Sequence, residues 1–384
     1  MTKTKKIAVV CNYALLPERV GGMDYFFWQF DAKCKENNIQ VDWFFPNIST
    51  HGKYPDLKIH SANDENIEHY FLHYLQQKET TYSHIITHFL ELCTPFFAAA
   101  KQLSKAEMIA VDHNPRPIGG YPLVKKIKKK IKGFLYSKYI DRFVGVSDYT
   151  ARELVKDFGF HLKNKIQVIH NGILLEDIQV RTSRSQTKPI FLTTSHLRES
   201  KGIQDLIQAV DELPKEIKEE ICIDIYGDGP FRKSLEQQVS RLGLEHCFHF
   251  MGSSSQLKSI YGKYDYMLQP THMECFSLSI LESLAANVPV ITTNVGGNEE
   301  AIINNVNGYI FKAKDVSTLK SILAEVYLGI KKIDLNTRID VQSRFTLEKM
   351  VEQHFLILTE NPFRVQNPFR VQNSERVDNK ITNK

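Results

Sequence analysis

Short apolar runs alternate with longer amphipathic segments along most of the chain. In the first half, the runs have the length and the content of β-branched and aromatic residues that are typical of buried strands. They lie at residues 6–13, 41–45, 84–89, 108–113, 142–147 and 166–172. The segments between them, such as residues 22–38, are amphipathic. We therefore predict one parallel sheet with helical crossovers for this half.

The alternation stops at a polar stretch with few large apolar residues, 176–189, and then restarts. The second set of strand-like runs lies at residues 190–195, 221–227, 246–252, 264–270, 289–293 and 308–312. Helical patterns such as "IQDLIQAVDEL" separate them. Two sets of βα units joined by a polar segment predict an α/β protein in which two Rossmann-like domains face each other across a cleft.

These patterns give a predicted domain division. We expect a first Rossmann-like domain at 1–175, a linker at 176–189 and a second domain at 190–345. A helix at 346–360 is expected to pack back toward the first domain. Residues 361–384 are polar and contain a direct repeat of "NPFRVQ", which is typical of a disordered tail.

Composition narrows the class of protein. A hydrophobic content of 42% and a charged content of 24% are ordinary for a globular protein. No apolar run approaches the ~18 residues of a membrane span, and the apolar run after the basic start is too short for a signal peptide. The six cysteines include no C-x-x-C pair. These features predict a cytoplasmic protein with reduced cysteines.

Two glutamates beside one predicted helix are candidates for ligand binding. Glu274 follows the apolar run 264–270 and lies in the loop before the helix. In a parallel sheet this is the carboxyl end of a strand, where ligands bind. Glu282 lies eight positions further on. An alternative for Glu282 is a purely structural role, because Ser279 and Glu282 have the spacing of a capping box.

Several segments, in their order along the chain, resemble the family-4 retaining glycosyltransferases of the GT-B fold. In the second half they are residues 195–202, 225–230, 267–297, Glu300 and 304–311. In the first half they are residues 21–30, 111–115, 146–155 and 168–172. The resemblance covers nearly all of residues 1–360. The pair of glutamates followed by Gly-Gly is its most specific part.

The resemblance implies a nucleotide-sugar donor, either a UDP- or a GDP-sugar, and a role for each candidate residue. Glu274 would bind the sugar ring, Glu282 the ribose, and His113 a sugar hydroxyl near the developing positive charge. Lys201 would supply a point charge to the diphosphate. The implied catalytic residues are Glu274, His113 and Lys201. The implied donor-binding residues are Gly21, Gly22, His196, Gly227, Gly229, Phe276, Ser277, Leu278 and Glu282.

Elementary chemistry agrees with these roles. A diphosphate is stabilised by a helix N-terminus, and the backbone N–H groups of residues 276–278 open the helix after Glu274. Glycine at positions 21 and 22 permits a close backbone approach. The chain contains no D-x-D triplet. We therefore expect neither a metal ion nor a cofactor beyond the donor itself, with Lys201 and helix dipoles balancing the diphosphate charge.

Two positions depart from the family pattern. Ser195-His196 stands where the family has Gly-Arg, so a permanent cation is replaced by a titratable one. Arg198 is a possible substitute. Asn287 stands where the family has Gly after the helix. Because Asn is the second-best residue for a left-handed cap, we expect the local structure to be retained.

The segment 123–135 carries lysines on both sides of an apolar stripe. The lysines are Lys125, Lys126, Lys128, Lys129, Lys130 and Lys132, and the apolar residues are Val124, Ile127, Ile131, Phe134 and Leu135. One interpretation is a solvated helix packed on its own sheet. The other is docking on an anionic membrane surface. Nucleic acid is not expected as a partner, because the aromatic residues do not form a stacking platform.

The favoured function is a retaining glycosyltransferase on the inner face of the plasma membrane. It would move a sugar to a glycan acceptor, lipid-linked in the favoured interpretation, in bacterial surface polysaccharide synthesis. A nucleotide-sugar epimerase on the same fold and a non-catalytic nucleotide-sugar-binding protein stay as alternatives. A nicotinamide dehydrogenase has no support, because no G-x-G-x-x-G follows a strand.

Overall fold

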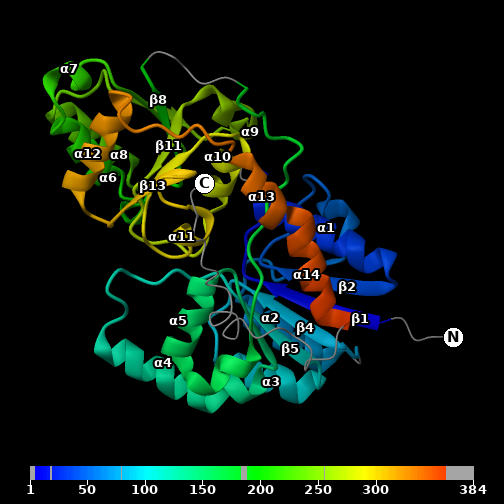
Figure 1. Cartoon of the computed structure of the whole chain (residues 1–384). Coiled ribbons are helices and arrows are strands. Elements are labelled where there is room, and N and C mark those ends of the chain that lie inside the picture. The colour runs from blue at the N-terminus through cyan, green and yellow to red at the C-terminus, as the bar shows by residue number, and fades with distance from the viewer. Residues whose placement is uncertain (1–4, 18–19, 79, 183–187, 255, 360–384) are drawn as a thin grey trace, which may run out of the picture.

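The computed structural model describes residues 5–17, 20–78, 80–182, 188–254 and 256–359. The predicted disordered tail, 361–384, lies outside the described residues, as does part of the predicted linker. The described chain forms two parallel sheets, each covered by helices (Figure 1). This confirms the prediction of two Rossmann-like domains.

The sheet of the first domain has seven strands in the order β3-β2-β1-β4-β5-β6-β7. Every neighbouring pair is parallel. The strands are β1 (Lys5–Cys11), β2 (Ile39–Phe45), β3 (Ile59–Ser61), β4 (His84–His88), β5 (Glu107–Asp112), β6 (Arg142–Gly145) and β7 (Ile166–Val168). Each run predicted as a strand overlaps one of them, but β3 was not predicted. β7 ends earlier than expected, because the chain after Val168 leaves the sheet and Ile173 pairs with Thr346.

Helices cover both faces of this sheet because alternate strand residues are apolar on each side. Val9 packs in one cluster with Phe26 and Phe27 of the first helix, and Ala8 packs in another with Phe71 and Phe97. The helices of this domain are α1 (Gly22–Glu36), α2 (Ile67–Gln77), α3 (Pro95–Ser104), α4 (Leu123–Tyr136) and α5 (Asp148–Phe158).

The second domain has a parallel sheet of six strands in the order β10-β9-β8-β11-β12-β13. The strands are β8 (Ile190–Thr194), β9 (Cys222–Tyr226), β10 (Phe248–Gly252), β11 (Tyr266–Gln269), β12 (Val290–Thr293) and β13 (Gly308–Phe311). The helices are α6 (Ile203–Asp211), α7 (Lys215–Lys218), α8 (Arg232–Arg241), α9 (Leu257–Ile260), α10 (Leu278–Ala285), α11 (Asn298–Ala301), α12 (Val316–Tyr327) and α13 (Arg338–Arg344).

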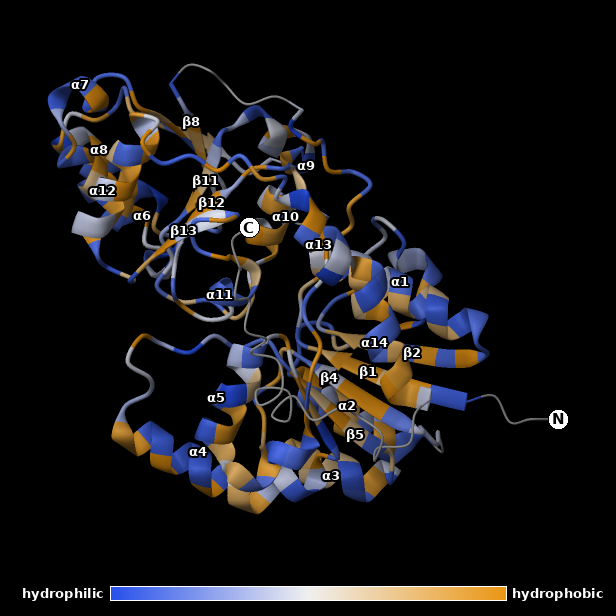
Figure 2. Ribbon diagram, in the orientation of Figure 1, coloured by the Kyte–Doolittle hydropathy of each residue, from blue (hydrophilic) through white to orange (hydrophobic). Residues whose placement is uncertain are grey.

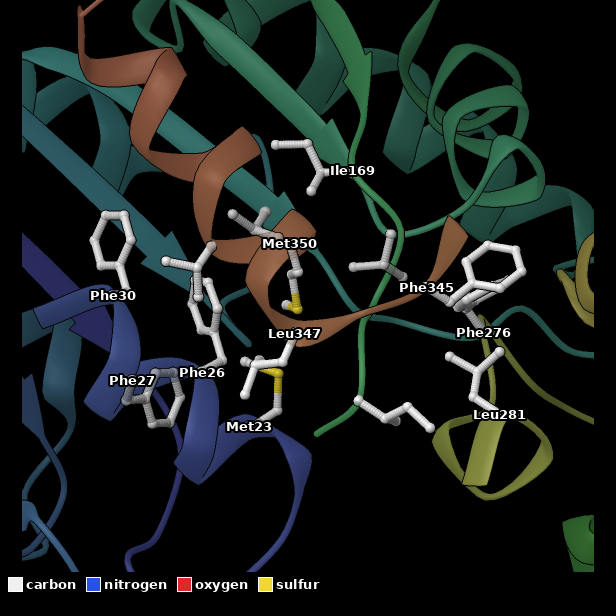
Figure 3. Packing of buried hydrophobic residues seen from close by; sticks show 14 of the residues in the cluster. Met23, Phe26, Phe27, Phe30, Ile169, Phe276, Leu281, Phe345, Leu347 and Met350 are labelled. Atoms are coloured by element: carbon white, nitrogen blue, oxygen red, sulfur yellow. The ribbon is translucent and has the colours of Figure 1, made fainter. Parts of the chain in front are cut away.

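The last described helix, α14 (Leu347–Thr359), returns to the first domain and packs against α1 (Figure 1). The ring of His354 lies 4.7 Å from that of Phe26, and Lys33 and Glu352 form an ion pair at 2.7 Å. One buried apolar cluster runs from α1 through α14 to α10 of the second domain (Figure 3). The two domains therefore share a core on this side of the molecule.

Hydrophobic residues concentrate along the two sheets and at the joint between the domains, and they also lie along the peripheral helix α4 (Figure 2). Within the described ranges, no helix is both long enough and apolar enough to cross a bilayer. The six cysteines are free thiols.

Candidate active site

A cavity of about 570 Å³ lies where the carboxyl ends of the strands in the two domains face each other. Most of the residues that the sequence indicated line it. They are Gly21, Gly22, His113, His196, Lys201, Gly227, Glu274, Phe276, Ser277, Leu278 and Glu282. Gly229 is not among the lining residues. The candidate site is therefore formed in the first domain by residues at the ends of α1 and β5, and in the second domain by α10 and by residues that follow β8, β9 and β11.

Glu274 and Lys201 form an ion pair inside this cavity. The distance from Nζ of Lys201 to the Glu274 carboxylate is 3.0 Å, and both side chains are largely buried. Gly202, which follows Lys201, has φ +71°, and a Cβ there would lie 1.9 Å from the carbonyl oxygen of Pro270. The loop that carries Lys201 is thus packed directly on the end of β11. This packing holds an ammonium and a carboxylate side by side.

The N-terminus of α10 opens into the same cavity. Ser277 is its N-cap: the Ser277 hydroxyl accepts a hydrogen bond from the backbone N–H of Ile280 and another from the amide of Gln269. The capping box proposed for Ser279 and Glu282 is therefore wrong, because the helix begins before Ser279. The first N–H groups of α10 have no partner within the helix, so they are suited to bind an anion.

Glu282 lies in the second turn of α10 rather than in the first, where the sequence interpretation had placed it. The Tyr261 hydroxyl donates a hydrogen bond to its carboxylate at 3.0 Å. Burial raises the pKa of Glu282, and the hydrogen bond from Tyr261 opposes that rise. Tyr261 and Thr194 share a further hydrogen bond at 3.0 Å. Tyr261 and Thr194 also line the cavity, and neither was indicated by the sequence.

His113 follows β5 at the edge of the cavity. Its Nε2 lies 3.0 Å from Nδ1 of His88, and its ring stacks on Phe89 with centroids 4.2 Å apart. Burial lowers the pKa of His113 to about 3. The imidazole is therefore neutral at physiological pH and adds no positive charge to the cavity.

Glycines let the walls of the cavity approach each other. A Cβ at Gly22 would lie 2.8 Å from a methyl group of Leu278, which belongs to the other domain. Gly227 has φ +124°, and a Cβ there would lie 1.9 Å from the carbonyl oxygen of Ser195. A Cβ at Gly229 would lie 2.4 Å from the carbonyl oxygen of Leu197. Gly229 thus packs the loops behind the cavity instead of lining it.

The two departures from the family pattern have different positions. His196 lies exposed on the cavity wall, whereas Arg198 is not among the lining residues. Asn287 has φ +61° directly after α10, which confirms the left-handed cap. Its side chain also donates to the carbonyl of Arg181 and accepts from the N–H of Thr337.

A polar bridge behind the cavity joins the domains. Glu300 of α11 accepts hydrogen bonds from the backbone N–H groups of Asp148 and Tyr149, each at 2.8 Å, at the N-terminus of α5. His170 lies 2.8 Å from the same carboxylate. The Ser147 hydroxyl donates to the carbonyl of Cys275, next to Glu274. The sequence indicated Glu300 only as part of a family motif. Its partners could not be predicted, because they lie about 130–150 residues away in the chain.

Comparison with known families agrees with this architecture. The family model described as Glycosyltransferase Family 4 matches residues 20–177, and the model described as Glycosyl transferases group 1 matches residues 176–333. The two matches meet at residues 176–177, and each covers most of one of the domains described above.

Relatives and solved structures show the same similarity. N-acetyl-alpha-D-glucosaminyl L-malate synthase of Bacillus anthracis is 29% identical over 174 residues, covering 44% of this chain and 45% of the relative. Glycogen synthase of Mycobacterium tuberculosis is 30% identical over 189 residues, covering 48% and 45%. The chain thus matches about half the length of these curated relatives.

The crystal structure of Anabaena Alr3699/HepE in complex with UDP and glucose has a TM-score of 0.72 at 17% identity. The similarity covers 94% of this chain and all of that one. At this identity the likeness concerns the fold alone. With both family models matched in order, the chain belongs to the family-4 glycosyltransferases of the GT-B fold.

Proposed function

We propose that this chain transfers a sugar from a UDP- or GDP-sugar to a hydroxyl of a lipid-linked glycan, with retention of the anomeric configuration. The observation that carries the proposal is the Glu274–Lys201 pair beside the open N-terminus of α10, in a cavity between two domains. A nucleotide diphosphate suits this site because its negative charge meets an ammonium and free helix N–H groups. The structural relatives that contain UDP or UDP-glucose give further support.

In the proposed transfer, each residue of the site has its own role. Lys201 and the first N–H groups of α10 stabilise the diphosphate as its bond to the anomeric carbon breaks. Glu282, oriented by Tyr261, accepts hydrogen bonds from the ribose, and Glu274 does so from the sugar. The acceptor oxygen bonds to the anomeric carbon, and its proton passes to the departing diphosphate. His113 contributes a neutral hydrogen-bonding group. Closure between the domains excludes water that would otherwise hydrolyse the donor.

Acceptor-dependent release of nucleotide tests this activity. The protein is incubated with UDP- and GDP-sugars, with and without glycan acceptors, and the free nucleotide and the product are measured. Glu274→Gln is expected to lower turnover by about a hundredfold or more. Glu299→Gln is the matched control, because Glu299 is exposed on α11. Conversion of the donor without an acceptor would instead support the epimerase, and binding without any turnover would support a silent binding protein.

We also propose that α4 docks on an anionic membrane surface, and the orientation of this helix supports the proposal. Its apolar residues point away from the protein: Val124 is 65% exposed, Ile131 53% and Phe134 80%. The side of α4 that touches the protein is marked by Gly133, where a Cβ would lie 2.2 Å from the carbonyl oxygen of Phe158. The apolar stripe of α4 therefore faces solvent and does not pack on the sheet. A solvent-facing apolar stripe flanked by lysines matches the charge and polarity of an anionic bilayer surface.

Flotation with vesicles tests this docking. Vesicles containing anionic lipid should bind the protein, and neutral vesicles should not, with binding reduced by salt. Ile127→Ser combined with Ile131→Ser should abolish flotation. Leu328→Ser combined with Ile330→Ser is the control, because these residues lie on the other domain and are at least as exposed as Ile127 and Ile131. Equal flotation with both lipid compositions, or an equal loss in both variants, would refute the assignment of the surface to α4.

A further inference from the structure

A second cavity, also of about 570 Å³, lies between the domains next to the candidate active site. The connection between β5 and α4 borders both: His113 and Pro115 line the first cavity, whereas residues 116–121 line the second. Residues 294–296 and His272 supply the opposite wall from the second domain. A Cβ at Gly296 would lie 2.2 Å from the carbonyl oxygen of Glu274. The second cavity therefore backs directly onto the loop that carries Glu274.

The second cavity has an excess of positive charge. Four cations line it, Arg116, Lys126, Lys130 and Lys156, against two carboxylates, Glu153 and Asp157. Arg116 is buried and neutralised by Asp112 at 2.7 Å and by Asp157 at 3.0 Å, and Lys156 pairs with Glu153 at 2.7 Å.

Lys126 and Lys130 differ from Arg116 and Lys156, which are both paired with carboxylates. The side chain of Lys130 donates to the carbonyl of Val155 at 3.4 Å. Among the residues that the structure describes, neither lysine has a carboxylate within ion-pair distance. They stand one helical turn apart on α4, so their ammonium groups can bind one anion together.

The same two lysines border the exposed apolar stripe of α4. Lys126 precedes Ile127 and Lys130 precedes Ile131, and both isoleucines are at least half exposed. An anion held by these lysines would therefore lie between the apolar face of the helix and the interdomain cavity. A phosphate ester that joins a lipid chain to a glycan has this order of groups. Its lipid chain would lie on the apolar face, its phosphate at the two lysines, and its glycan in the cavity between the domains.

We propose that the second cavity binds the phosphate of a lipid-linked acceptor, with Lys126 and Lys130 as its ligands. The lipid follows the apolar stripe of α4, and the glycan extends past Pro115 toward Glu274. This inference rests on the proposed glycosyl transfer, and it adds the chemical class of the acceptor: a phosphate or diphosphate ester of a lipid. The site is distinct from the donor diphosphate site, which is formed by Lys201 and α10.

Binding of farnesyl diphosphate to the full chain, measured by calorimetry in saturating UDP, tests the site without requiring turnover. UDP occupies the donor diphosphate site, so the remaining binding reports on the second cavity. Lys126→Ala combined with Lys130→Ala should weaken the binding of farnesyl diphosphate by about tenfold or more, because two charged contacts are lost. Farnesol, which has no phosphate, should bind weakly and equally to all variants.

Lys128→Ala combined with Lys132→Ala is the matched control. These two lysines have the same spacing on the same helix and the same change in charge, but they lie outside the second cavity. The control should bind farnesyl diphosphate like the wild type. Equal weakening in both double variants, or full competition by UDP, would overturn the proposal. Pyrophosphate binding as tightly as farnesyl diphosphate would assign the cavity to a water-soluble phosphorylated acceptor instead. Failure of both UDP and GDP to bind would separately refute the proposed function.

Discussion

Two buried histidines, His88 and His354, and the half-buried His113 lie at the joint between α14 and the first sheet, and they predict a loss of stability in mild acid. His88 and His113 are hydrogen-bonded at 3.0 Å, and the ring of His354 lies 6.1 Å from that of His88. Burial lowers the pKa of His113 to about 3 and that of His354 to about 4, and it also lowers the pKa of His88. All three side chains are therefore neutral in the folded protein at neutral pH.

The sign of the effect follows from proton linkage. An unfolded histidine binds a proton with a pKa of about 6.5, whereas the folded ones stay neutral until the pH is much lower. The stabilisation is thus complete above about pH 6.5 and is lost as the pH falls toward 4 and 3. At pH 5.0, His113 and His354 should each lower the free energy of unfolding by about 2 kcal/mol. Together this is a large part of a typical stability of about 5–15 kcal/mol.

Urea unfolding at pH 7.5 and pH 5.0, followed by circular dichroism, measures the loss. His354→Phe keeps a ring beside Phe26 and removes one titrating group, so its loss of stability should be about 2 kcal/mol smaller than that of the wild type. His69→Gln is the control, because His69 is exposed on α2. Equal stability of the wild type at the two pH values would refute the reasoning. The same acid-induced loss in His354→Phe as in the wild type would show that His354 does not contribute to it.

Four further substitutions test single parts of the site. Glu282→Ala should weaken UDP binding by about tenfold or more in calorimetry, because a charged hydrogen-bond acceptor is lost. His196→Arg should lower the donor KM more at pH 8 than at pH 6, because arginine stays charged where histidine does not; identical pH profiles would exclude a protonated histidine at the diphosphate. Gly227→Ala should destabilise the chain by about 1–3 kcal/mol in thermal unfolding, since φ is +124° and the space is filled. Glu300→Gln should lower kcat while leaving the UDP Kd unchanged, because it weakens the bridge between the domains and leaves the donor site intact.

The strands of both sheets could be predicted because parallel strands covered on both faces are continuous apolar runs. β3 was not predicted, because it has only three residues, all half exposed, and so it forms no apolar run. The start of α10 was placed wrongly because Ser277 and Ser279 have the same chemistry. Only the contacts of Ser277 with Ile280 and Gln269 distinguish the cap.

Periodicity also left the orientation of α4 open. An apolar stripe with lysines on its flanks is compatible with either a buried or an exposed apolar face. The contact of Gly133 with the backbone of Phe158 decides between them, and it depends on a residue 25 positions away. The second cavity was not predicted for a related reason, because its walls come from the β5–α4 connection, α5 and two loops of the second domain. Tertiary contacts of this kind leave no signal in local sequence.

The two domains are joined by a shared apolar core and by hydrogen bonds, and these two kinds of contact differ in the free energy needed to break them. On the side of α13 and α14 the domains share a continuous apolar core that includes Phe276, Phe345 and Met350 (Figure 3). Beside this core the domains also meet through hydrogen bonds, chiefly those of Glu300 with the N-terminus of α5. The two kinds of contact adjoin, because His170 lies 2.8 Å from the Glu300 carboxylate and its ring packs against Phe276 and Phe345. Breaking the hydrogen bonds exchanges them for bonds to water at a small net cost, whereas separating the apolar core exposes buried surface. Domain opening should therefore break the Glu300 bridge while the shared apolar core stays closed.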